Sequence, residues 1–303
     1  MSALSPRAPL ACLLCAVVVL LCGASAPSAH AQAPAPTGVS ALERIARSGV
    51  VHVGYIPTPG TFAFRDAAGE TVGYSIDVCQ RVVQNLRKVL AQPALRIEFK
   101  PLEAAQRIPL LKAGAIDIEC GGNTNTVVRQ KDVDFSHTLF TTGVRFLARQ
   151  AVLIDGVPSL WRRRVAVSKG TTAQETMARV QREQELQVVV VATDVEGVRL
   201  VEEGTVHAFA QDDILLYALL AASPKKDSLH VTGRHLTVEP YAFMLPKDDA
   251  PLREVVDRTV LALMHSGELA GLYRKWFDTD ALRIPMSAHM RENIRYPNKY
   301  GIP

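Results

Sequence analysis

The stretch that most constrains the fold is residues 107–130, which read RIPLLKAGAIDIECGGNTNTVVRQ. Apolar residues run at helical spacing up to Gly114, a residue suited to the turn past a helix end, and residues 116–120 then alternate between apolar and acidic with the period of a strand. A polar loop, GGNTNT, follows the strand. It leads to a second helix that we expect to begin at residue 125 or 126, with Arg129 in its first turn.

The predicted position of Arg129 indicates an anion site. A cation in the first turn of a helix opposes the helix macrodipole. We therefore interpret this arginine, the free backbone N–H groups and a threonine hydroxyl as a group of donors that holds an anion. The alternative is an arginine that pairs with a nearby aspartate or is simply solvated, and other features of the chain favour the anion site.

Residues 1–31 are typical of a cleavable secretory signal peptide, with a basic residue, an apolar run and an Ala-His-Ala cleavage sequence that ends at Ala31. A flexible leader over residues 32–40 would follow. Leu21 is larger than the small residue that a lipoprotein cleavage site needs before Cys22, so no lipid anchor is expected. We predict export to the periplasm.

Removal of 31 of the 303 residues leaves 272, a length that suits two compact lobes. No other apolar run is long enough to cross a bilayer. The net charge is +4 and acidic and basic residues are interspersed, which gives no indication of nucleic-acid binding.

Three of the five cysteines lie in the predicted signal peptide, and Cys79 and Cys120 remain. In an oxidising compartment two cysteines allow one pairing. The sequence gives no distance between the helix that contains Cys79 and the strand end that contains Cys120, so two buried thiols are the alternative. Of the two, we predict the disulfide.

Strands and helices alternate along the mature sequence, which predicts an α/β fold of two lobes with largely parallel sheets. We place the first lobe at residues 41–141 plus 238–303 and the second at residues 142–237. Two extended crossings would join them. Expected strands include residues 50–54, 95–99, 164–168, 188–192 and 206–210, the 188–192 strand being buried, and a Pro-rich tail from residue 278 would run over the surface.

The second lobe offers another anion-favouring helix start. A strand, a Lys-Gly turn and Thr171-Thr172 open a helix, and we expect a capping box between Thr172 and Glu175. The alternative is an ordinary α/β crossover cap. Asp212 and Asp213 begin a further helix, where N-capping is the alternative role.

The sequence contains no GxSxG, HExxH, Walker or GxGxxG motif, and its histidines lack metal-ligand spacing. We therefore predict no catalytic residue, metal or cofactor. The predicted site suits a zwitterion instead, with a carboxylate at Arg129 and the Thr171-Thr172 turn and an ammonium group at Asp212 and Thr124. Binding between lobes fits this arrangement better than catalysis.

Six segments, in this order, resemble the family 3 solute-binding proteins of polar amino-acid ATP-binding-cassette importers, and within them the glutamate/aspartate-binding group. They are GYSIDVC, the 107–130 stretch, VDFS, SKGTT, QDD and KWF. The resemblance spans about residues 42–277. It implies a two-lobed periplasmic-binding-protein fold (type II) with two hinge crossings and a ligand cleft between the lobes. It also implies a monomeric protein without catalytic activity that delivers an amino acid to an inner-membrane permease.

The resemblance also implies roles for single residues. One arginine would hold the α-carboxylate together with two threonines, a threonine and an aspartate would hold the α-ammonium group, and the second arginine would hold an acidic side chain. The residues for the α-carboxylate are Arg129, Thr171 and Thr172. Those for the α-ammonium group are Thr124 and Asp212, and the arginine for the acidic side chain is Arg107. Gly122 completes the expected ligand-binding set.

Several positions depart from the glutamate/aspartate group. Ile56, Pro59 and Ala104 replace polar or aromatic side chains, Gly122 replaces a serine, and the histidine expected near residues 194–196 is missing. The groups for the α-amino acid are retained and the side-chain pocket is altered. We therefore predict glutamate or aspartate, bound more weakly than in a fully equipped pocket, and a neutral polar amino acid is the alternative.

The same fold also hosts periplasmic dehydratases. That enzyme alternative would require a carboxylic acid, such as Glu119 or Glu239, to enter the cleft with a raised pKa.

Overall fold

The computed structural model of the protein describes residues 39–280 and 282–303. The predicted signal peptide, residues 1–31, and residues 32–38 of the predicted leader lie outside the described residues. Among the residues that are described, no helix combines the length and the apolar character needed to cross a membrane.

The first sheet has five strands in the order β4-β1-β5-β14-β6. The strands β4 and β5 pair with β1 in parallel, and β14 pairs antiparallel with β5 and β6. The bounds are β1 Val50–Tyr55, β4 Arg96–Pro101, β5 Ile118–Glu119, β6 Val133–Phe135 and β14 Met244–Pro246. A small antiparallel hairpin, β2 (Phe64–Arg65) and β3 (Thr71–Val72), follows β1 in the chain.

The second sheet also has five strands, in the order β10-β9-β11-β8-β12. Its members are β8 Val144–Arg149, β9 Arg164–Ser168, β10 Gln187–Val191, β11 Ala208–Asp212 and β12 Leu229–Thr232. The strands β10, β9 and β11 are parallel, and β8 is antiparallel to both of its neighbours. Both sheets are thus mixed, and the expectation of largely parallel sheets is wrong. The reason is that β8 and β14 enter their sheets from an extended crossing and not from a helical crossover, which parallel pairing requires.

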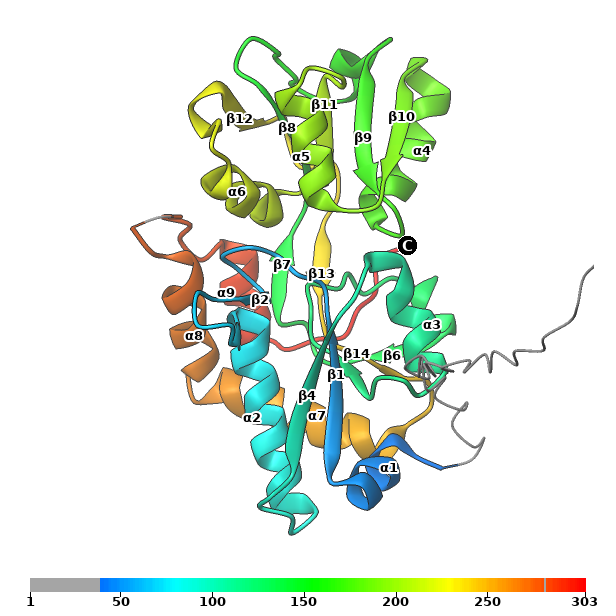
Figure 1. Cartoon of the computed structure of the whole chain (residues 1–303), viewed down its shortest axis with the longest axis vertical. Helices are drawn as coiled ribbons and strands as arrows, with labels where there is room; N and C mark the ends of the chain where they lie inside the picture. The colour runs from blue at the N-terminus through cyan, green and yellow to red at the C-terminus, as the bar shows by residue number, and fades with distance from the viewer. Residues whose placement is uncertain (1–38, 281) are drawn as a thin grey trace, which may run out of the picture. The chain divides into compact units, whose positions relative to one another are not determined.

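Two extended segments run between the sheets (Figure 1). The strand β7 (Phe140–Thr142) leads directly into β8, and β13 (Glu239–Tyr241) leads towards β14. The two pair antiparallel, with Glu239 opposite Thr142 and Tyr241 opposite Phe140. Because both crossings are short and adjacent, they can bend together as a hinge.

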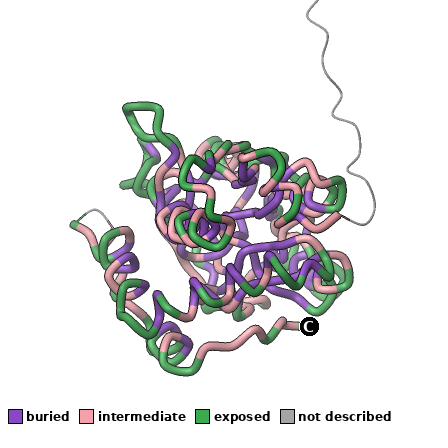
Figure 2. The backbone as a smooth tube through the Cα atoms, turned by 90° about the horizontal axis from the view of Figure 1, so that it is seen from below, coloured by how far each residue is buried: buried purple, intermediate pink, exposed green. Residues whose placement is uncertain are grey.

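Helices cover the sheets as their sequences dictate. In α2, buried Val78, Val82 and Leu86 recur every four residues and so form one apolar face. Burial of each such side chain is worth about 1.5–3 kcal/mol. This face joins a core that also contains residues of α1, α7, α8 and α9, and Figure 2 shows the buried residues in the interior of the fold. The bounds are α1 Ala41–Ser48, α2 Tyr74–Val89, α3 Arg107–Lys112, α7 Ala250–His265, α8 Glu268–Phe277 and α9 Ala288–Arg295.

The second sheet has an apolar core on each face. Its helices are α4 Thr172–Gln184, α5 Asp194–Glu202 and α6 Asp213–Ala222. The strand β10 is less buried than predicted, and Val190 is 49% exposed. The reason is its place at the edge of the sheet, where its apolar residues cover only one face.

The prediction of a helix that begins at residue 125 or 126 is wrong. The segment contains only the short 3-10 helix Arg129–Lys131. Two causes are visible: Thr126, Val127 and Val128 are β-branched and disfavour helix, and the backbone here bonds elsewhere. The N–H of Asn125 donates to Pro240 O and that of Val127 to Ile302 O, both at 2.8 Å.

The tail from residue 278 contains the helix α9, which the Pro-rich sequence did not indicate. Ser287 caps it by accepting from Met290 N at 3.0 Å, and Met290 and Asn293 are buried. The remaining short 3-10 helices are Ala104–Gln106, Val157–Leu160 and Lys226–Ser228.

Candidate functional site

One cavity, of about 40 Å³, contains every residue that the sequence assigned to ligand binding. These are Arg107, Gly122, Thr124, Arg129, Thr171, Thr172 and Asp212. They come from α3, from the segment after β5, from the turn after β9 and from the end of β11. The cavity therefore brings together residues that neighbour both sheets. Its volume is the space of about three water molecules, so an amino acid requires it to widen.

Arg129 is 7% exposed and forms no ion pair with any described residue. Its guanidinium donates to Thr124 O at 3.0 Å and to Gly170 O at 3.2 Å, both backbone carbonyls. Burial lowers the pKa of Arg129, because the charged form loses hydration. Since a guanidinium has five N–H donors, this buried cation keeps donors for an anion. The anion-site interpretation thus rests on burial, because the helix that motivated it does not form.

Arg107 is also buried and lies in the same cavity. It donates to Ala104 O at 2.8 Å, to Asn123 Oδ1 at 2.7 Å and to Gly170 O at 3.0 Å. Burial, and next the charge of Arg129, lower its pKa to about 10. Two arginines that share the Gly170 carbonyl repel each other, and a bound anion relieves that repulsion.

The start of α4 lies at the cavity, one residue earlier than the predicted capping box. Thr171 is the N-cap, since its Oγ1 accepts from Gln174 N at 3.2 Å. The capping box between Thr172 and Glu175 is therefore wrong by one position. Because Thr172 is not the cap, its hydroxyl is available for another hydrogen bond, and it donates to Glu239 Oε2 at 2.9 Å.

Asp212 supplies the negative side of the cavity. It is 4% exposed, and its Oδ2 accepts from the Tyr241 hydroxyl. It stands at the N-cap position of α6 but makes no capping bond, so the N-capping interpretation does not hold for it. Its Oδ1 is buried and has no hydrogen-bond partner among the described residues. Burial, and next the charge of Glu239, raise the pKa of Asp212 well above its usual range.

Gly122 and Thr124 line the cavity, and both contact Tyr241. Thr124 forms a β-bridge with Tyr241. A Cβ at position 122 would lie 2.6 Å from the Tyr241 ring, which is closer than real Cβ contacts. Glycine at this position therefore makes room for the tyrosine that holds Asp212.

The cavity also contains residues that the sequence reasoning did not assign to it. They are Thr58, Gln211 and Leu215, besides Ile56, Ala104 and Asp194, whose positions were noted only as departures. One signal could have indicated Gln211: it stands at the end of a strand, and in open α/β sheets ligands bind beyond the carboxyl ends of the strands.

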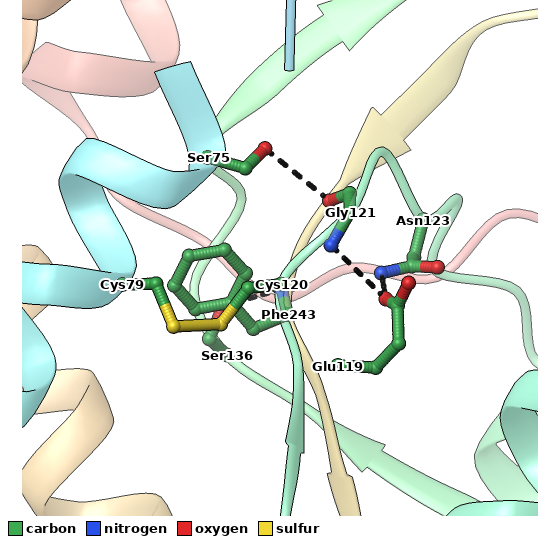
Figure 3. Close-up of a disulfide and its surroundings, with 8 residues drawn as sticks. All are labelled: Ser75, Cys79, Glu119, Cys120, Gly121, Asn123, Ser136 and Phe243. Carbon is green, nitrogen blue, oxygen red and sulfur yellow. Dashed lines mark hydrogen bonds between the residues drawn. A yellow bond between two sulfur atoms is a disulfide. The ribbon is translucent and has the colours of Figure 1, made fainter. Parts of the chain in front are cut away.

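A disulfide joins Cys79 of α2 to Cys120 at the end of β5, with Cα atoms 6.2 Å apart, and confirms the predicted pairing (Figure 3). Both cysteines are fully buried. The bond fixes the chain one residue before Gly121, where the segment containing Gly122 and Thr124 begins. The site thus has a covalent support on its first-sheet side.

The two acids named as examples for the enzyme alternative, Glu119 and Glu239, do not line the cavity. Glu119 is fully buried, and its Oε2 accepts from Gly121 N at 3.1 Å and from the Asn123 amide (Figure 3). Burial raises its pKa. Glu239 lies behind Thr172, to which it is hydrogen-bonded.

Two mixed α/β lobes, paired extended crossings and a buried, charged cavity define the class of two-lobed ligand-binding proteins. The chain belongs to the bacterial extracellular solute-binding proteins, family 3, which it matches over residues 51–279. This membership confirms the predicted fold class. The protein is a solute-binding protein and not an enzyme.

Relatives in two bacteria cover nearly the whole chain. The glutamate/aspartate import solute-binding protein of Salmonella typhimurium is 33% identical over 92% of this chain and 95% of its own length. The Escherichia coli protein with the same description is 32% identical, over 93% and 96%. Among solved structures, an ancestral arginine-binding protein bound to arginine is similar with a TM-score of 0.69. It is 26% identical, over 76% of this chain and 98% of that chain.

Proposed function

We propose that the protein captures glutamate or aspartate in this cavity and delivers it to an ATP-binding-cassette permease of the inner membrane. The observation that carries the proposal is the pair of incompletely satisfied, oppositely charged groups in one buried cavity. Arg129 keeps free donors, and Asp212 Oδ1 has no partner among the described residues. An α-amino acid supplies both missing partners at once.

The α-carboxylate would bind to Arg129 and to the start of α4, where Thr171 and Thr172 present backbone N–H groups. The α-ammonium group would bind to Asp212 Oδ1 and to Thr124. Burial makes both interactions strong, because an unpaired charge in such a cavity is costly. This requirement selects for a zwitterion.

Arg107 would bind the carboxylate of the ligand side chain. The relatives described as glutamate/aspartate proteins support this choice. Ile56 and Ala104 line the same cavity and offer no side-chain donor. Since a hydrogen bond to a charged group contributes about 1.5–3 kcal/mol, the affinity for an acidic ligand is expected to be lower than with more donors present. A second candidate is a neutral polar amino acid, which the acidic Asp194 in the cavity favours.

Capture would proceed by closure of two lobes, residues 41–141 plus 238–303 and residues 142–237, about the β7 and β13 crossings. The antiparallel pairing of these strands supports a hinge at this place. The protein would act as a monomer in the periplasm.

Isothermal calorimetry with the common amino acids tests the proposal. We expect binding of glutamate or aspartate, or of their amides, and a loss of affinity in Arg107→Ala. A preference for lysine or arginine would contradict the assignment, because Arg107 repels a cationic side chain. Equal affinity for an acidic ligand in wild type and Arg107→Ala would show that Arg107 only supports the fold.

A further inference from the structure

Asp194, the first residue of α5, lies in the ligand cavity with only one carboxylate oxygen engaged. Its Oδ1 accepts from the Ser168 hydroxyl and from Gln211 Nε2, the latter at 2.9 Å. Within residues 39–280 and 282–303, no group donates to Oδ2. Asp194 also lines a neighbouring cavity of about 410 Å³, which shares Ile56 and Ala104 with the first. Asp194 therefore lines both cavities with a carboxylate that has one oxygen without a donor among the described residues.

The charged surroundings of Asp194 come from three elements. Arg107 of α3 is the cation that acts on it, and Asp212 of β11 and the Tyr241 phenol of β13 are its other titratable neighbours. Of the remaining charged groups on elements packed against α5, Arg164 is exposed at the end of β9 away from Ser168, and the others have partners of their own. Arg145 donates to Gly233 O and to the Tyr217 hydroxyl, Arg149 to Val201 O, and Asp213 accepts from Thr142 and pairs with His235.

We infer that Asp194 is a specificity-determining residue. Together with Arg107 it selects a ligand side chain whose end offers one hydrogen-bond acceptor, for Arg107, and one donor, for Asp194. A carboxamide meets both groups as it stands, since its oxygen accepts from Arg107 and its NH₂ donates to Asp194. A carboxylate has no donor for Asp194, so it binds together with one proton. The inference rests on the proposed amino-acid site and assigns its side-chain chemistry.

The chemistry of two adjacent carboxylates supports this reading. An ionised aspartate only accepts hydrogen bonds, and two carboxylates that share a site hold one proton between them. Burial already raises the pKa of Asp194, while the bonds from Ser168 and Gln211 and the charge of Arg107 lower it. The negative charge of a ligand carboxylate beside Asp194 favours the state in which the two carboxylates share one proton.

The pH dependence can be isolated by a ratio. Asp212 also titrates, but it pairs with the α-ammonium group that glutamate and glutamine share. Its effect therefore cancels in the ratio of the two dissociation constants, Kd(glutamate) over Kd(glutamine). Uptake of one proton with glutamate changes this ratio about tenfold per pH unit.

The experiment measures both Kd values by calorimetry at pH 5.5 and 7.5 in wild type, Asp194→Asn and Glu196→Gln. In wild type we expect the ratio to rise by more than tenfold, and by at most about 100-fold, between the two pH values. Asp194→Asn keeps an acceptor for Ser168 and Gln211. In this variant the ratio should differ less than about threefold between the two pH values, and glutamate should bind more tightly at pH 7.5 than it does to wild type. Glu196 lies on the same helix, accepts a hydrogen bond from Ala192 N and lines neither cavity. Glu196→Gln removes this carboxylate and should behave as wild type.

A second measurement needs no variant. Calorimetry of the wild type in two buffers with different ionisation enthalpies counts the protons taken up, and glutamate should take up about one more than glutamine. Equal proton uptake, or a ratio with the same pH dependence in Asp194→Asn, would overturn the inference and leave the amino-acid site intact. Binding of neither ligand at any pH would overturn the proposed function itself.

Discussion

Reduction of the Cys79–Cys120 disulfide is expected to destabilise the lobe that contains it by about 4 kcal/mol. The two cysteines are 41 residues apart. In the chain-entropy treatment, a disulfide that closes a loop of this length lowers the entropy of the unfolded chain by about 13 cal/mol/K. This corresponds to a stabilisation of about 4 kcal/mol at 25 °C. Reduction is a cleaner perturbation than substitution, because both cysteines are fully buried and reduction leaves their packing atoms in place.

The assay is equilibrium urea unfolding followed by tryptophan fluorescence. The sequence contains two tryptophans, and Trp276 packs against the core that contains the disulfide. Trp161→Phe therefore leaves a single reporter on that core. With a urea dependence of about 1–3 kcal/mol/M, a loss of 4 kcal/mol moves the midpoint by more than 1 M.

The control is the double variant Cys79→Ala/Cys120→Ala, whose midpoint should not respond to reductant. Counting thiols before and after treatment establishes that the bond was present and was broken. An unfolding free energy that stays within about 0.5 kcal/mol after complete reduction would refute the loop argument, because ordinary scatter between independent sites is of that size.

Three further predictions concern ligand binding and are measured by calorimetry. Arg129→Ala leaves the α-carboxylate unpaired in a buried cavity and should cost about 2–5 kcal/mol of binding free energy, whereas unchanged affinity in a folded variant would move the site elsewhere. Asp212 has a raised pKa without ligand and must ionise to bind the ammonium group, so glutamine binding should weaken as pH falls from 7.5 to 5.5, and a flat profile would argue against this role. Gly122→Ala should also weaken binding, because the new Cβ displaces the Tyr241 ring that holds Asp212; normal affinity would mean that the ring moves without consequence.

The elements predicted well are those whose pattern matches their burial. In α2 the apolar residues recur at helical spacing, and the helix expected to contain Cys79 forms over Tyr74–Val89. The paired crossings were visible as extended runs. The helix expected after residue 125 failed because β-branched propensity and backbone bonds to the distant Ile302 outweighed the polar start signal. A bond to a residue so far along the chain leaves no local trace in the sequence.

The site was predicted in part for a wrong reason. Arg129 was singled out by a helix dipole that is absent, and its burial is what distinguishes it. That Arg107, Thr172 and Asp212 meet in one cavity depends on how the lobes are joined, which no local pattern encodes; the family resemblance supplied it. Residues 194–196 were noted only for a missing histidine, and Asp194 itself was given no role because an aspartate at a helix start is ordinarily a favourable first-turn residue.

The measurement that tests the central claim most directly is mass spectrometry of the ligand released by denaturation from protein purified out of the exported fraction. The account predicts an unmodified α-amino acid with a carboxyl or carboxamide side chain, in about equimolar amount. A ligand that lacks either the α-carboxylate or the α-ammonium group, or a product of chemical conversion of the amino acid, would contradict it.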